Sequence, residues 1–170
     1  KLYRRQGHIV PPRKIIKNAE QIEGIRESAK INTAVLDHVA ANIREGMSTE
    51  DINTLVYDFT VAHGAIPAPL NYEGFPKSVC TSINEEVCHG IPDKNIILRS
   101  GDIINVDVST IYNGYFSDAS RMFMIGEVAE DRQKLVRVTK ECLEKGIEAA
   151  QPWRFLGDVG AVIQEYAEEN

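Results

Sequence analysis

Residues 101–123 constrain the fold of this chain more than any other segment; they read GDIINVDVSTIYNGYFSDASRMF. Two strand-like runs flank Asn113-Gly114, a dipeptide that is the strongest short-range signal for a two-residue β-hairpin with a type I′ turn. The turn fixes the register. The pairs that follow from it are Tyr112 with Tyr115, Asp107 with Ser120, and Asp118 with Ser109.

This register places Asp107 and Asp118 on one face of the hairpin as diagonal neighbours, about 7–8 Å apart at the backbone. Carboxylates rarely lie in apolar strands unless a cation meets them, and a divalent metal is the usual cation. The two side chains could bind one ion, or bridge two ions about 3.5–4 Å apart. A β-bulge would shift the register, and a solvated pair of aspartates is the alternative. The opposite face suits a core: Ile104, Val106 and Val108.

The size and composition indicate a single soluble globular domain. The chain has 170 residues, of which 43% are hydrophobic, enough to bury a sizeable core. No apolar run approaches the roughly 18 residues of a membrane span, and no signal-peptide core is visible. Three cysteines without CxxC spacing favour a reducing compartment, by default the cytoplasm. Cys88 and Cys142 are predicted to fill the core.

The charge is distributed unevenly. A net charge of −6 disfavours nucleic acid as the main partner of the whole chain. Residues 1–17, however, contain six basic and no acidic side chains. This basic N-terminal arm could contact the ribosome, other RNA or another acidic surface. Alternatively, it is a solvated tail or a linker interrupted by Pro11-Pro12.

Periodicity and capping signals predict the other elements. A helix over 19–44 begins at the Asn18/Gln21 capping box, and a second begins at Ser48/Asp51 and stops at Gly64. Further predicted elements are strands at 78–83, 86–89 and 95–98, hairpin strands at 102–112 and 115–125, and helices over 130–150 and from 155 to the end. Helices segregated from an antiparallel strand block indicate an α+β fold in which helices cover the sheet.

Two segments resemble one family closely, the methionine aminopeptidases of type I. They are NYEGFPKSVCTSINEEVCHGIP at 71–92 and the hairpin at 101–123. The similarity extends over about residues 13–170. It implies a "pita-bread" fold, built from two similar halves around a dinuclear metal site. Residues 18–170 would form the N-terminal lobe, with the second lobe absent from this chain.

The resemblance also implies roles for individual residues. Asp107 and Asp118 match two metal ligands, which agrees with the hairpin argument. His89, in the sequence CHGIP, matches the active-site histidine that contacts the substrate. The residues that match walls of the methionine pocket are Tyr72, Phe75 and Cys80, although apolar residue types of this kind also fill cores.

The family uses five ligands, namely two aspartates, a histidine and two glutamates, for two divalent ions of the Mn, Fe, Co or Zn class. No histidine follows His89, so three ligands are expected outside this chain, and the 170 residues alone are expected to be inactive. Phe116-Ser117 stands where many members have His-Gly before the second aspartate. This departure is expected to alter the hydrogen bonding around that ligand.

The implied activity is removal of the initiator methionine from nascent proteins whose second residue is small, by a hydroxide that bridges the metals. The implied partners are a peptide N-terminus that begins with methionine, and the complementary lobe or a second copy of the chain. One alternative is a non-catalytic pita-bread module that binds a protein or RNA. Another is a prolidase-like peptidase, which the sequence FPKS at 75–78 disfavours.

Overall fold

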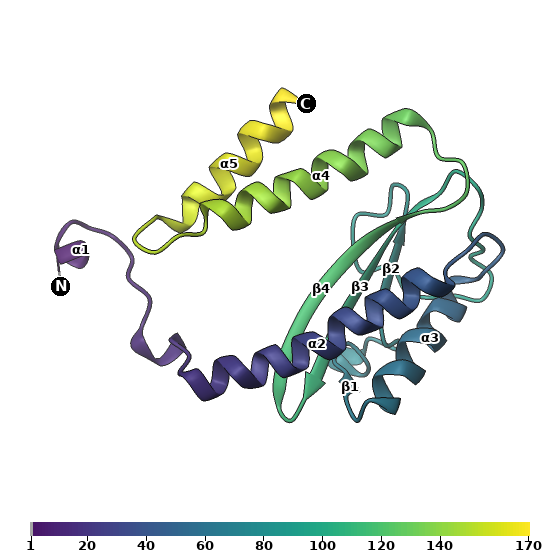
Figure 1. Cartoon of the computed structure of the whole chain (residues 1–170), viewed down its shortest axis with the longest axis horizontal. Coiled ribbons are helices and arrows are strands. Elements are labelled where there is room, and N and C mark those ends of the chain that lie inside the picture. The colour runs from purple at the N-terminus through teal and green to yellow at the C-terminus, as the bar shows by residue number, and fades with distance from the viewer. Residues whose placement is uncertain (1) are drawn as a thin grey trace.

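A computed structural model describes residues 2–170, and it is an α+β fold, as predicted (Figure 1). Short 3-10 turns lie at Arg13–Ile15 and Tyr72–Gly74. The helices and strands are α1 (Leu2–Arg5), α2 (Ala19–Asn42), α3 (Thr49–Ala62), β1 (Ile66–Pro67), β2 (Cys80–Ile83), β3 (Ile103–Tyr112), β4 (Tyr115–Met124), α4 (Glu130–Ala149) and α5 (Leu156–Glu169).

The sheet is antiparallel, and β3 is its central strand. β4 pairs along one side of β3, while β2 and the two-residue β1 pair with different parts of the other side. Asn113 and Gly114 both have positive φ, 50° and 80°, as a type I′ turn requires. The β3–β4 register is continuous and confirms the predicted pairs, with Asp107 opposite Ser120 and Ser109 opposite Asp118.

Helices α2 and α3 cover one face of this sheet (Figure 1). Ile104, Val106 and Val108 point into that interface and are fully buried, which confirms the predicted core face. They form one cluster with buried side chains of the two helices: Val35, Leu36, Val39, Ile52 and Val56. Because strand side chains alternate, the aspartates of β3 and β4 are left on the opposite face.

A buried polar contact attaches α2 to the hairpin. The Ser28 hydroxyl donates to the Thr110 carbonyl at 3.1 Å and shares a 2.7 Å hydrogen bond with the Ser117 hydroxyl. Asn32 Nδ2 donates to the Val108 carbonyl at 2.7 Å. Such bonds are directional, so they set where α2 lies along the strands more tightly than apolar contacts do.

Both predicted capping boxes are present, at Asn18/Gln21 and at Ser48/Asp51. The predicted strand at 86–89 is wrong. The chain turns there, with left-handed φ at Asn84 and His89, values that an extended strand cannot contain. The predicted strand at 95–98 is reduced to a single bridge between Ile97 and Ser48. Cys88 is exposed rather than in the core, whereas Cys142 is buried.

Helices α4 and α5 form a separate antiparallel pair beyond β4 (Figure 1). The α4–α5 pair resembles the α2–α3 pair in helix length, connection length and capping. Both α3 and α5 have 14 residues, and the preceding connections, 43–48 and 150–155, have equal length. Asp158 accepts from the Phe155 backbone N–H at 3.1 Å, and Asp51 likewise accepts from that of Ser48 at 2.7 Å.

Contacts between the helices of each pair also match. The His38 ring stacks on Phe59 with centroids 4.7 Å apart, and Lys145 Nζ lies 4.4 Å from the Tyr166 ring centroid. The two residues of each pair are separated by the same number of positions. Packing differs, however: Leu36 of α2 is 2% exposed, and the equivalent Leu143 of α4 is 59% exposed. The apolar side of α4–α5 is therefore uncovered in the described chain.

The described part of the basic arm, residues 2–17, is exposed and runs toward the α4–α5 connection (Figure 1). One aromatic contact joins them, between His8 and Phe155 with centroids 5.1 Å apart. None of the helices described between residues 2 and 170 combines the length and the apolar composition that a membrane span requires.

Candidate metal centre and peptide cavity

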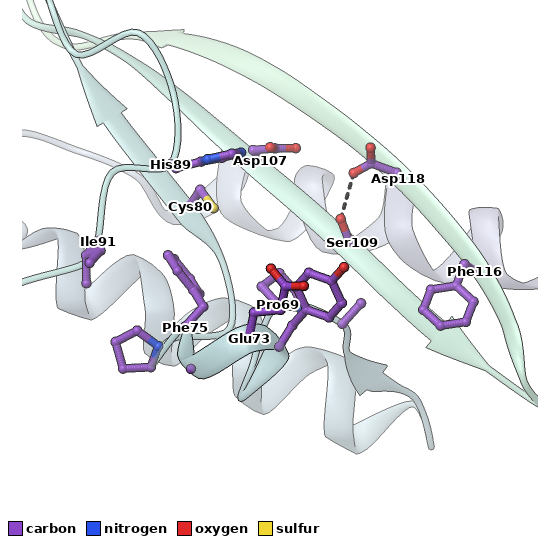
Figure 2. Close-up of a pocket in the computed structure, with 14 residues that line it drawn as sticks. Pro69, Glu73, Phe75, Cys80, His89, Ile91, Asp107, Ser109, Phe116 and Asp118 are labelled. Carbon is purple, nitrogen blue, oxygen red and sulfur yellow. Dashed lines mark hydrogen bonds between the residues drawn. The ribbon is translucent and has the colours of Figure 1, made fainter.

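The face of the sheet opposite α2 and α3 contributes to a cavity of about 840 Å³. Figure 2 shows Asp107 and Asp118 projecting from the adjacent strands β3 and β4 toward this space, with His89 beside Asp107. The lining residues are Ala68, Pro69, Tyr72, Glu73, Gly74, Phe75, Pro76, Cys80, His89, Ile91, Asp107, Ser109, Phe116 and Asp118. The structure thus brings together all six site residues suggested by the sequence.

Strand register fixes the neighbours of each aspartate. Cys80 of β2 is directly opposite Asp107, and Ser120 is opposite it on the other side. Asp118 lies opposite Ser109, whose hydroxyl donates to Asp118 Oδ1 at 2.7 Å (Figure 2). One oxygen of this carboxylate is therefore occupied by a protein donor, and Oδ2 is left for another partner.

The electrostatics of the cavity suit a cation. Burial raises the pKa of Asp107, the negative charge of Asp118 raises it further, and His89 opposes the change. Burial, followed by the charge of Asp107, raises the pKa of the Cys80 thiol to about 11. Both shifts report a site where negative charge is unfavourable without compensation. A divalent cation held by the carboxylates would supply that compensation.

The two aspartates do not make a full coordination shell. Within residues 2–170, no group of three or more His, Cys, Asp and Glu side chains is placed to hold a metal ion. Divalent ions that prefer oxygen ligands take about six or more of them. The two carboxylates would therefore need further ligands to complete the coordination of a divalent ion.

His89 is held at the cavity by the loop that follows β2. Its φ of 58° is left-handed, and the next residue, Gly90, accepts from the Thr81 N–H at 2.9 Å and donates to Ser82 Oγ at 3.2 Å. A Cβ at Gly90 would lie 2.0 Å from the Thr81 carbonyl oxygen. Only glycine fits there, so the His-Gly dipeptide in CHGIP has a direct steric explanation.

One side of the cavity is an apolar wall formed by Tyr72, Phe75 and Cys80, which lie in the segment 72–80. Phe75 is half-buried, Cys80 is buried, and Tyr72 is 67% exposed. The middle of this segment is attached to α3, because Lys77 forms an ion pair with Glu50 at 2.5 Å and the Ser78 N–H donates to Asn53 Oδ1 at 2.8 Å.

Sequence reasoning missed several lining residues. Ser109 was expected opposite Asp118, but its hydrogen bond was not, and the alternation of the hairpin could have suggested it. Phe116 lines the cavity and is 63% exposed, whereas the adjacent Ser117 points to the other face and contacts Ser28. Ser117 therefore lies on the face of β4 that packs against α2. The two residues that replace His-Gly are thus on opposite faces of β4, with Phe116 in the cavity and Ser117 against Ser28. Glu73 and Ile91 had not been singled out.

The chain is similar in sequence and in structure to known metallopeptidases. The family model described as metallopeptidase family M24 matches residues 23–170. Methionine aminopeptidase A of Synechocystis sp. is 51% identical over 148 residues, which cover 87% of this chain and 58% of that protein. The solved methionine aminopeptidase of Rickettsia prowazekii has a TM-score of 0.88 and 44% identity, covering 91% of this chain and 62% of that one. The resemblance to methionine aminopeptidases is thereby confirmed.

The chain spans about three fifths of the length of these relatives. Its fold is half of the pita-bread fold, as predicted. A prolidase from Pyrococcus furiosus, with a TM-score of 0.77 and 21% identity, shares the fold alone and says nothing about substrate.

Proposed function

This chain belongs to the metallopeptidase family M24, and on that premise we propose that it is the N-terminal lobe of a methionine aminopeptidase. Its activity would be the removal of initiator methionine from nascent proteins. The observation that carries the proposal is the convergence of Asp107, Asp118 and His89 on one cavity. Residues 18–170 form the lobe in this proposal, and residues 1–17 form a basic arm outside it.

Asp107 and Asp118 would provide two of the ligands for two divalent ions of the Mn, Fe, Co or Zn class. Bound there, such ions would lower the pKa of a water molecule to yield hydroxide and would polarise the scissile carbonyl. The hydrogen bond from Ser109 keeps Asp118 Oδ1 oriented. His89, beside Asp107, would donate a hydrogen bond to the substrate oxygen as negative charge develops on it.

The apolar wall would select the methionine side chain. Tyr72, Phe75 and Cys80 offer aromatic and sulfur surface, which a flexible thioether packs against favourably. The raised pKa of Cys80 keeps its thiol neutral, so that it adds no charge to this wall. We propose that the second residue of the substrate must be small because it lies close to the ligand-bearing strands.

The remaining ligands would come from a complementary lobe. The repeat of α2–α3 in α4–α5 supports this idea, since α2 and α3 cover a sheet and the apolar side of α4–α5 is uncovered. We propose that a second antiparallel sheet packs there and brings further ligands toward Asp107 and Asp118. A second copy of the chain is the alternative source of that cover.

The proposal also includes the setting of the reaction. The cysteines, Cys80, Cys88 and Cys142, are all free, which is usual for a reducing compartment, and we place the protein in the cytoplasm. The exposed basic side chains of residues 2–17 suit contact with the RNA of the ribosome, from which nascent chains emerge.

The test is methionine release from Met-Gly-Met by the full-length protein, assayed with Mn²⁺ or Co²⁺ and then with a chelator. We expect metal-dependent release, much slower cleavage of Met-Leu-Met, and no release by the isolated 170-residue chain. Binding of peptides without release by the full-length protein would favour a non-catalytic binding module instead. Turnover by the isolated chain would contradict the need for further ligands.

A further inference from the structure

One acidic side chain of the cavity belongs to neither the β3–β4 hairpin nor the loop that holds His89, and it has no role in the proposed reaction. Glu73 lies in the 3-10 turn Tyr72–Gly74 and lines the cavity with the two aspartates. We propose that Glu73 makes the site prefer peptides with a cationic side chain downstream of the scissile bond. The inference rests on the proposed function and adds a substrate class to it.

The backbone at Glu73 is held in an unusual conformation. Its φ is 48°, and two other residues of the same turn region, Asn71 and Gly74, have φ values of 67° and 87°. Non-glycine residues rarely adopt this conformation, and those that do cluster at functional sites. Hydrogen bonds maintain the turn: the Asn71 N–H donates to Phe75 O at 2.8 Å, and the Phe75 N–H donates to Tyr72 O at 2.9 Å. The turn therefore presents Glu73 to the cavity from a fixed backbone.

The charges around the cavity have one sign. No lysine or arginine is among the lining residues, and the only basic type is His89. In the described chain, residues 2–170, Glu73 forms no ion pair or side-chain hydrogen bond. Once cations neutralise Asp107 and Asp118, Glu73 is the negative charge that remains for a peptide side chain to meet.

Glu73 is placed to contact the part of a bound peptide that follows the scissile bond, and not its N-terminal methionine. Figure 2 shows Glu73 between Phe75, on the apolar wall, and Phe116 of β4, and all three residues line the cavity. With methionine against Phe75 and its carbonyl at the aspartates, the chain beyond the scissile bond leaves past Glu73 and Phe116. A lysine or arginine side chain there meets the Glu73 carboxylate, and an acidic side chain is repelled by it.

Matched peptides test this preference in the full-length, metal-loaded protein. The substrates are Met-Ala-Lys and Met-Ala-Glu with amidated C-termini, and the measured quantity is the ratio of their kcat/KM values. Because exposed ion pairs are weak, we expect a preference for the lysine peptide of about two- to tenfold. Glu73→Gln should bring the ratio close to one, and Glu73→Lys should invert it. In wild type the ratio should fall as salt rises.

A matched control is Glu45→Gln, since Glu45 is exposed in the α2–α3 connection and is not among the cavity residues; it should keep the wild-type ratio. If methionine is released but the wild-type ratio is near one, or Glu73→Gln leaves it unchanged, the charge preference is overturned while the peptidase function stands. If neither peptide nor Met-Gly-Met is cleaved, the proposed function fails and the preference fails with it.

Discussion

The Ser109 hydroxyl donates a hydrogen bond of 2.7 Å to Asp118 Oδ1, directly across the β3–β4 ladder. This contact orients one proposed metal ligand from the neighbouring strand. Removing such an orienting partner typically weakens metal binding about 10- to 100-fold. We therefore expect Ser109→Ala to reduce metal affinity by that order, measured by calorimetric titration of the metal-free full-length protein. Ser120→Ala removes a hydroxyl from the same hairpin without a bond to either aspartate, and an equal loss there would contradict the specific role of Ser109.

Substitution of Asp118 should be more severe than loss of its partner. Asp118→Asn removes a negatively charged oxygen ligand while conserving shape, so we expect at least about a 100-fold drop in methionine release. Metal affinity should fall in parallel. Asp58→Asn, an exposed aspartate on α3, is the matched control. An unchanged rate for Asp118→Asn would remove this residue from the ligand set.

The raised pKa of Asp107 predicts a pH-dependent stability in the metal-free protein. Its pKa lies above the ordinary value of 3.8 because of burial and the charge of Asp118. The folded state then binds this proton more tightly than the unfolded state does, so its contribution to stability falls as pH rises above 3.8 and stays reduced at neutral pH. Asp107→Asn should accordingly raise the free energy of unfolding at pH 7, with a smaller gain as the pH approaches 3.8.

Urea denaturation in the presence of a chelator, at neutral and acidic pH, measures this difference. Asp58→Asn serves again as control and should show no comparable trend. A gain that is the same at every pH would mean that packing, rather than ionisation, separates the two proteins.

The buried contact between α2 and β4 should contribute to stability independently of metal. Ser117→Ala leaves the Ser28 hydroxyl without its 2.7 Å partner, although Ser28 still donates to the Thr110 carbonyl. We expect a loss of about 1 kcal/mol in the free energy of unfolding. A double-mutant cycle with Ser28→Ala should show coupling between the two positions. Additive effects would mean that the contact carries no energy of its own.

The cysteines should react in a defined order. Cys88 is exposed, whereas Cys80 and Cys142 are buried, and the pKa of Cys80 is raised to about 11. Since the thiolate is the reactive form, iodoacetamide at pH 8 should label Cys88 first in the chelated protein. Peptide mass analysis over time measures the order, and Cys88→Ser provides the control by removing the fast phase. Faster labelling of Cys80 would contradict its burial and raised pKa.

The hairpin was predictable from sequence because its signals are local. Asn113-Gly114 dictates the turn, the turn dictates the register, and the register places Asp107 and Asp118 on one face, opposite Val106 and Val108. Capping boxes located the starts of α2 and α3 for the same reason, since the side chain and the backbone N–H that it meets are three residues apart. These features need no knowledge of the rest of the chain.

Other features depend on which distant segments meet. The segment predicted as a strand at 86–89 is a turn that brings Gly90 against the Thr81 carbonyl, a contact that the apolar residue types around 87–88 do not reveal. Glu73 lines the cavity because its backbone is left-handed, in a turn that a hydrogen bond between Asn71 and Phe75 closes. Sequence alone determined which face of the hairpin has the carboxylates, through a strict two-residue alternation. Only tertiary packing decided what surrounds them, because a cavity is made by segments whose approach no local pattern encodes.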